Sequence, residues 1–101
     1  MRALAAGMLV ALAACGEVEM TAEQKAERDG FRLCGAEVRS RLNNPSSLEW
    51  DRSAVTYFHD DEGVWIGRPF TAENAFGGKV RNVANCHYDP GQERLVSISI
   101  D

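Results

Sequence analysis

The most chemically suggestive residues are consecutive: His59, Asp60, Asp61 and Glu62, followed by Gly63. Hard divalent cations prefer clustered carboxylate oxygens, so this run could bind a metal ion. The same run is also typical of a solvated turn between two β-strands. No Asp-x-Asp-x-Asp-Gly spacing and no zinc-type pattern accompanies it, which favours the turn. We therefore predict no metal site and no cofactor.

A second candidate is the adjacent pair Cys86 and His87, in which the imidazole could activate the thiol as a nucleophile. This chemistry is lost if Cys86 forms a disulfide bond. The sequence has no Gly-x-Ser-x-Gly elbow, His-Glu-x-x-His helix, phosphate-binding loop or Cys-x-x-Cys pair. A domain this small also encloses a large pocket with difficulty. We therefore predict no catalytic residues, no enzymatic activity and no small-molecule substrate.

The N-terminal segment has the layout of a secretory leader. Arg2 is followed by almost entirely small and apolar residues up to Ala14, and an acidic segment begins after Cys15. A membrane-spanning helix needs about 20 apolar residues, and this run is far shorter. Because the run has no polar face, it would also suit a soluble domain poorly. We predict a cleaved signal peptide over residues 1–14, a tether over 15–20 and a single domain over 21–101.

The end of this segment, Leu12-Ala13-Ala14-Cys15, resembles the lipobox of bacterial lipoproteins. The resemblance implies cleavage before Cys15, a diacyl group on its sulfur and an acyl chain, such as palmitate, on its new amino group. It also implies a lipid-anchored protein of the cell envelope that faces the periplasm. Gly16 stands where lipoproteins of enteric type usually carry an aspartate for inner-membrane retention, which favours the outer membrane.

The charge restricts the possible partners. The chain has 15 acidic and 11 basic side chains, and loss of Arg2 with the leader brings the net charge to about −5. A negative protein is repelled by nucleic acid and by anionic bilayer surfaces, so we predict no nucleic-acid partner. Attachment to the membrane would then depend on the acyl chains of Cys15, and stable anchoring requires more than one chain.

The remaining cysteines are even in number if Cys15 carries lipid. Cys34 and Cys86 would then share an oxidising compartment. We predict a disulfide bond between them, which closes a loop of about fifty residues. The alternative is a pair of buried free thiols, which the compartment disfavours.

The sequence after the tether predicts one helix. Thr21 and Gln24 have the spacing of a capping box, and apolar residues recur every three or four positions over 31–42. Asn43-Asn44-Pro45 supplies a stop signal. Gly30 indicates a weak point, and the charged first turns are expected to be solvated.

Period-two patterns then predict four strands: 48–58, from Val64 onward, 79–88 and 96–100. Turn residues separate them at 59–63 and 89–91. One helix followed by four strands predicts an α+β fold, with the helix packed across one face of an antiparallel meander. The Cys34–Cys86 bond would staple the helix to the sheet.

The stretch Asn43 to Trp50, with Asn74-Ala75-Phe76-Gly77-Gly78 and Cys86, resembles an arrangement in small uncharacterised exported and prophage-encoded bacterial proteins. Those proteins have a helix, a strand entered through Pro-x-Ser/Thr and a strand ending Ala-x-Asn-x-Phe-Gly. The resemblance supports the fold and implies no activity. Arg68-Pro69 departs from the arrangement. Because proline cannot donate to a sheet ladder, we expect a bulge or an edge strand there.

Aromatic residues are the candidates for partner contacts. Phe76, beside two glycines, either folds back over the core or stands out from the surface, and we expect the core. Trp50, Trp65 and Phe70 face the same alternatives. If several of them share the face that the helix leaves uncovered, they would form an apolar patch that marks a partner site. The candidate contacts are Phe76, Trp65 and Phe70.

Two functional hypotheses follow. The first is a binding or structural lipoprotein that presents its sheet face or edge to another envelope protein. The alternative is an inhibitor or exclusion factor, of prophage type, that blocks an incoming enzyme or phage component. In the second hypothesis Phe76 and the turn from Asp60 to Glu62 are the inserted elements.

Overall fold

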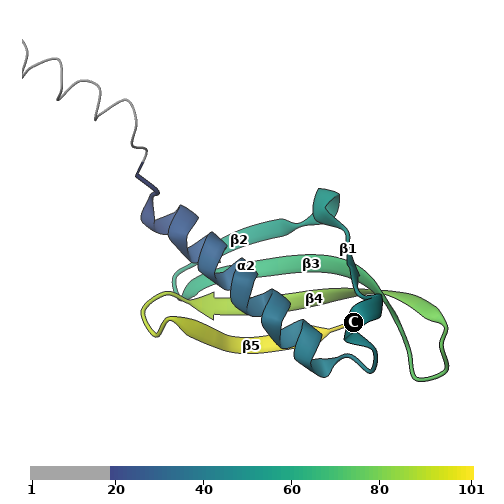
Figure 1. Cartoon of the computed structure of the whole chain (residues 1–101). Helices are drawn as coiled ribbons and strands as arrows, with labels where there is room; N and C mark the ends of the chain where they lie inside the picture. The colour runs from purple at the N-terminus through teal and green to yellow at the C-terminus, as the bar shows by residue number, and fades with distance from the viewer. Residues whose placement is uncertain (1–18) are drawn as a thin grey trace, which may run out of the picture.

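The computed structural model describes residues 19–101, so the predicted leader and Cys15 lie outside the described residues. In this part of the chain one α-helix, α2 (Ala22–Arg41), packs across one face of a five-stranded antiparallel sheet (Figure 1). The strands are β1 (Glu49–Trp50), β2 (Thr56–Asp60), β3 (Gly63–Glu73), β4 (Lys79–Asp89) and β5 (Arg94–Ile100). Strands β2 to β5 form the expected meander, and β1 is an additional short strand. The predicted α+β fold is confirmed.

Helix α2 begins at the predicted capping box. The Gln24 backbone N–H donates to Thr21 Oγ1 at 3.1 Å, and the Thr21 N–H donates to Gln24 Oε1 at 2.9 Å. These bonds satisfy two N–H groups that have no partner within the helix. The helix ends at Arg41, one residue before the predicted limit, and Pro45–Ser47 forms a short 3₁₀ turn.

Gly30 is a close-packing position rather than a weak point. It is buried, and a Cβ atom there would meet Ile66 Cδ1 and lie 2.9 Å from Tyr88 Cβ. The missing side chain therefore lets the helix approach β3 and β4. The first turns are exposed as expected, except that Ala26 is buried.

The predicted strand over 48–58 is interrupted. Arg52–Ala54 forms a 3₁₀ turn, which divides the segment into β1 and β2. Asp51 causes the break, because its Oδ1 accepts hydrogen bonds from both the backbone N–H and the hydroxyl of Ser53. Such local bonds compete with the sheet ladder. The two strand segments pair with different parts of β3, as Trp50 with Phe70 and Thr56 with Gly67.

The same break accommodates Pro69, where the prediction of a bulge or an edge strand is wrong. The β3–β4 register runs without interruption through the pair Pro69 and Val83, and β3 is an interior strand. The Pro69 carbonyl accepts from the Asp51 N–H at 3.0 Å. Within a strand the N–H and C=O of one residue point to the same side, so the missing donor faces the interruption between β1 and β2.

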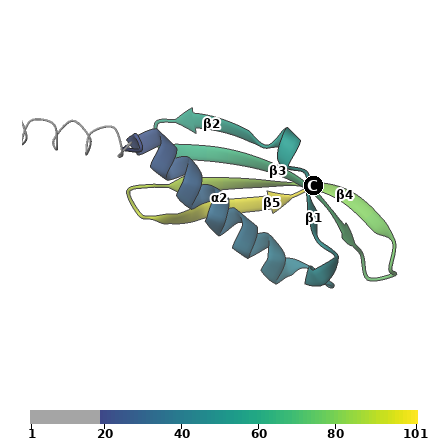
Figure 2. The same ribbon diagram turned by 45° about the horizontal axis from the view of Figure 1, so that its top comes forward.

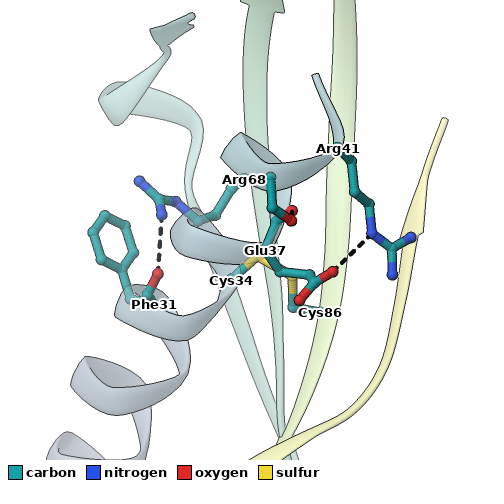
Figure 3. The surroundings of a disulfide bond; sticks show 7 residues. Phe31, Cys34, Glu37, Arg41, Arg68 and Cys86 are labelled. Atoms are coloured by element: carbon teal, nitrogen blue, oxygen red, sulfur yellow. Dashed lines mark hydrogen bonds and ion pairs between the residues drawn. A yellow bond between two sulfur atoms is a disulfide. The ribbon is translucent and has the colours of Figure 1, made fainter. Parts of the chain in front are cut away.

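The core lies between α2 and the sheet, and the predicted disulfide bond is at its centre (Figure 3). Cys34 and Cys86 are bonded, their Cα atoms are 5.8 Å apart, and both residues are fully buried. The alternative of two free thiols is therefore wrong. His87 consequently has no neighbouring thiol to activate. The bond is surrounded by Val38, Phe70, Ala72 and Ala84.

The two ends of the sheet differ. The β2–β3 turn and the β4–β5 turn lie beside the start of α2, while the β3–β4 hairpin tip, 74–78, lies at the opposite end (Figures 1 and 2). The chain therefore enters the domain at the end that carries the acidic turn. No helix within residues 19–101 is long and apolar enough to cross a membrane.

Candidate binding face

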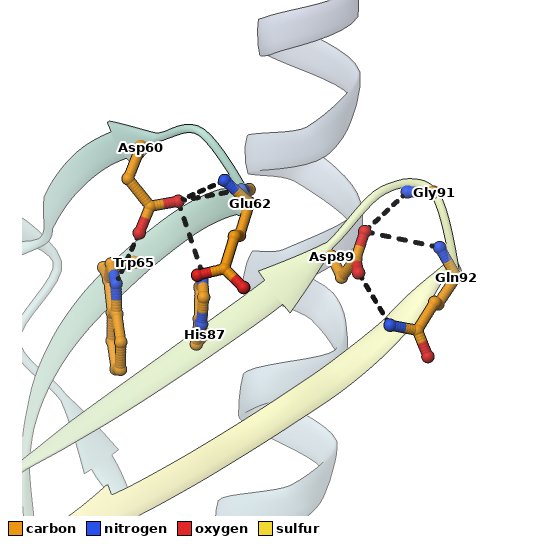
Figure 4. Close-up of polar contacts among 8 residues, drawn as sticks. Asp60, Glu62, Trp65, His87, Asp89, Gly91 and Gln92 are labelled. Atoms are coloured by element: carbon orange, nitrogen blue, oxygen red, sulfur yellow. Dashed lines mark hydrogen bonds and ion pairs between the residues drawn. The ribbon is translucent and has the colours of Figure 1, made fainter.

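The sheet face that α2 leaves uncovered carries a cluster of three side chains in mutual contact, Asp60, Trp65 and His87 (Figure 4). Trp65 and His87 are paired across β3 and β4, and their rings stack at a centroid distance of 4.2 Å and an angle of 6°. The indole Nε1 of Trp65 donates to Asp60 Oδ2 at 3.1 Å. The tryptophan is thus held by a ring on one side and by a carboxylate at its edge.

Asp60 is itself held by the turn that follows it. Its Oδ1 accepts the backbone N–H groups of Glu62 at 2.9 Å and Gly63 at 2.8 Å. Burial acts to raise the pKa of Asp60, but the bonds from Glu62, Gly63 and the Trp65 indole outweigh it. The pKa therefore lies below 3.8, and the carboxylate is ionised at neutral pH.

His87 forms the enclosed side of the cluster. Only 7% of its surface is exposed. Its Nε2 lies 3.5 Å from Asp60 Oδ1, which is within ion-pair distance but too far for a good hydrogen bond, so this buried nitrogen has no hydrogen-bond partner among the described residues. The ring therefore serves mainly as a flat support for Trp65.

Phe58 completes the exposed part of this face. It is the cross-strand neighbour of Trp65 on β2, and 66% of its surface is exposed, against 38% for Trp65. We call these two residues the aromatic patch. Tryptophan is enriched among the residues that contribute most to binding energy, and a side chain already held in place loses little entropy on binding. The patch has the properties of a preformed protein contact.

The predicted contacts Phe70 and Phe76 have different positions. Phe70 is fully buried beneath α2, in edge-on contact with Trp50, so the prediction that it contacts a partner is wrong. Phe76 is 96% exposed, so the expectation that it covers the core is also wrong. Asn74 explains the exposure, because its Oδ1 accepts the N–H groups of Phe76 and Gly78 and closes the hairpin on its own backbone.

The structure does not bring Phe76 and Trp65 together. They are separated by most of β3, and a strand of that length spans about 25 Å. The acidic turn, 60–62, is at the same end as Trp65. The aromatic patch and the hairpin tip are therefore separate candidate contacts.

The first carboxylate of the acidic turn, that of Asp60, is already engaged in hydrogen bonds within the domain. Both oxygens of Asp60 accept hydrogen bonds from the turn or from Trp65. Across residues 19–101, no group of three or more His, Cys, Asp or Glu side chains is arranged to hold a metal ion. A shallow hollow of about 430 Å³ lies between this turn, the start of α2 and residues 89–91.

Two features of this face were missed by the sequence analysis. Phe58 lies in the segment predicted as a strand, and its alternation with Tyr57 and His59 places it on the opposite face from them. The hydrogen bond that the Trp65 indole donates to Asp60 has no sequence signal, because it depends on how a turn folds back on the next strand. Comparison of the chain with protein-family models, with curated proteins and with solved structures gives no match.

Proposed function

We propose that this protein is a lipid-anchored module of the bacterial cell envelope that binds another envelope protein and catalyses no reaction. The lipobox-like sequence at Cys15 supports the anchor, with the domain facing the periplasm and the outer membrane favoured. The Cys34–Cys86 bond is consistent with an oxidising compartment. Anchoring through Cys15 would place the start of α2, and with it the acidic turn, towards the membrane.

The aromatic patch is the observation that carries the binding proposal. Phe58 and Trp65 are exposed on the sheet face that α2 leaves uncovered, and Trp65 is fixed by His87 and Asp60 before any partner arrives. Large rigid aromatic side chains on a flat face suit a protein surface.

Site-specific photo-crosslinking in the native host tests this proposal. A benzoylphenylalanine in place of Phe58 is expected to capture one defined envelope protein, because this position lies beside Trp65. The Trp65→Ala change in the same chain should abolish the capture. The Cys15→Ser change should release the protein from membranes and leave the domain folded, since the described domain does not include Cys15.

The matched control places the same crosslinker at Ser40, an exposed position on α2. Equal capture from Ser40 and from position 58, or capture that survives Trp65→Ala, would contradict binding through the aromatic patch. Membrane retention of the Cys15→Ser protein would contradict the anchor.

The alternative function, an inhibitor or exclusion factor, is favoured by a different observation: the exposure of Phe76 at a hairpin tip. An apolar residue on a narrow tip can enter a cleft of a target. The acidic turn cannot enter the same cleft, because it lies at the other end of the sheet. The inhibitor proposal therefore rests on the hairpin tip alone.

Phe76→Ser separates the two proposals. Phe76 is almost fully exposed, and a Cβ atom added at the neighbouring Gly77 would meet nothing within 4 Å. The change should therefore leave the thermal midpoint within about 2 °C of the original value. An inhibitor would lose protection of the host in a phage or competitor challenge, while the patch-binding module would keep its crosslinked partner. Full protection by the Phe76→Ser protein would remove the inhibitor proposal.

A further inference from the structure

Arg68 is a buried arginine on the helix-facing side of β3. Only 5% of its surface is exposed, and its guanidinium lies between the rings of Phe31 and Trp50, at 3.5 and 3.7 Å from their centroids. Nη1 donates to the Phe31 carbonyl at 2.9 Å (Figure 3). Nε is enclosed and has no hydrogen-bond partner among the described residues.

Within residues 19–101, this guanidinium has no carboxylate partner. The ion pairs between side chains of residues 19–101 do not include Arg68, Arg39 or Arg52. The pKa of Arg68 is lowered to about 10, mainly by burial and in part by the charges of Arg52 and Arg39, while Tyr57 acts in the opposite direction. A buried charge without a counter-charge is costly for the fold.

The surrounding residues keep space for the charged group. A Cβ atom on Gly35 would lie 2.5 Å from Arg68 Nη1, so glycine is the residue that leaves room for the guanidinium beneath α2. Phe31 and Trp50 cover its two faces and leave only its edge for a ligand. In Figure 3 the terminal nitrogen that is not bonded to Phe31 points away from the helix. An edge of this kind matches the in-plane geometry of a carboxylate.

Two further arginines lie close enough for their charges to act on Arg68. Arg39 comes from α2, Arg52 from the turn that separates β1 and β2, and Arg68 from β3. We call these three residues the arginine edge. Arg68 lies on the helix side of the sheet, whereas Trp65 and Phe58 are on the other face. Arg39 and Arg52 are exposed, so their charges can be reached by a partner.

We propose that the arginine edge binds an acidic segment of a partner protein, whose carboxylates supply the counter-charge that Arg68, Arg39 and Arg52 lack. Charges contributed by three separate elements suit a segment with several carboxylates better than a single small anion. This site is separate from the aromatic patch and does not depend on it.

Titration of the ¹⁵N-labelled full chain, in mild detergent, with N-acetylated hexaglutamate tests the proposal. The Nε–H resonance of Arg68 should be protected from solvent exchange before addition and should shift on addition, because that group is enclosed beside the binding edge. Raising the salt concentration should weaken the binding. Hexaglutamine should produce no shift.

Two variants test whether these three arginines bind the acidic peptide. Arg39→Gln with Arg52→Gln should weaken hexaglutamate binding by about tenfold or more, since two charge-assisted contacts are removed. Arg68→Met should abolish binding while the protein stays folded, because methionine is flexible enough to fill the space between Phe31 and Trp50. Circular dichroism and the dispersed amide spectrum establish folding in each case.

The matched control is Arg32→Gln with Arg94→Gln, which removes the same charge from exposed positions away from the arginine edge. Equal weakening by both double variants would show non-specific attraction and overturn the proposal. An unshifted Arg68 resonance would also overturn it. Equal competition by inorganic phosphate, or tighter binding to vesicles containing phosphatidylglycerol than to hexaglutamate, would show a different ligand and overturn the assignment to an acidic protein segment.

Discussion

Replacing Cys34 and Cys86 together by alanine is expected to lower the free energy of unfolding by about 4 kcal/mol, the value that chain entropy assigns to a loop of this length. The bond joins residues 52 positions apart and links α2 to β4, so its loss frees most of the domain in the unfolded state. A small domain has about 5–15 kcal/mol of stability in total, so this is a large share. Urea unfolding of the double variant and the original protein measures the difference.

Reductant supplies the control for the disulfide prediction. Under reducing conditions the free energy of unfolding of the original protein should fall nearly to that of the double-alanine variant, because the cross-link is then absent from both. A remaining difference would report the packing of the two buried sulfur atoms rather than the bond. A loss below about 1 kcal/mol in the oxidised comparison would contradict a dominant role for the cross-link.

Gly63→Ala is expected to cost more than about 3 kcal/mol, among the largest effects of a single methyl group. Gly63 has a φ of +154°, and a Cβ atom there would collide with the Tyr88 carbonyl oxygen and lie 3.2 Å from the Asp89 Cα. Both contacts are backbone atoms of the neighbouring strand, which cannot rotate away as a side chain can. The β2–β3 turn and the first pairs of β3 with β4 would separate.

Gly77→Ala is the matched control for Gly63→Ala. Gly77 also has positive φ, at +82°, but a Cβ atom there would meet nothing within 4 Å. Its cost should be only that of left-handed backbone, about 1 kcal/mol. Thermal and urea unfolding of the two variants compare them directly. Equal losses of unfolding free energy at the two positions would mean that β3 and β4 move apart easily, and would contradict the predicted collision at Gly63.

The candidate site was only partly predictable, and Trp65 illustrates the limit. Its exposure follows from the period-two pattern, because Val64 and Ile66 are apolar on the other face. The ring of His87 below it and the carboxylate of Asp60 beside it come from other strands. These neighbours depend on strand register, and a strand pattern alone does not specify which residues of two strands are paired.

The burial of Arg68 is predictable from the alternation of residues along β3. The alternating residues Val64, Ile66, Phe70 and Ala72 are apolar and buried, and Arg68 occupies the middle of the same row. The alternation alone would place its side chain beneath the helix. What the alternation does not show is the absence of a carboxylate partner, since any helix or neighbouring strand could have supplied one.

The sequence by itself determined the helix, its start at Thr21, the alternation of β3 and β4, and the pairing of Cys34 with Cys86. These features depend on local spacing, capping and cysteine number. The alternation predicted for β5 is wrong at Val96, because a register shift between His87 and Tyr88 pairs Tyr88 with Leu95 and leaves Val96 exposed. The tertiary structure alone decided that Phe76 is exposed and that the strand after Pro45 breaks at Arg52–Ala54. Both depend on how a turn bonds to its own backbone, which is not encoded in a repeating pattern.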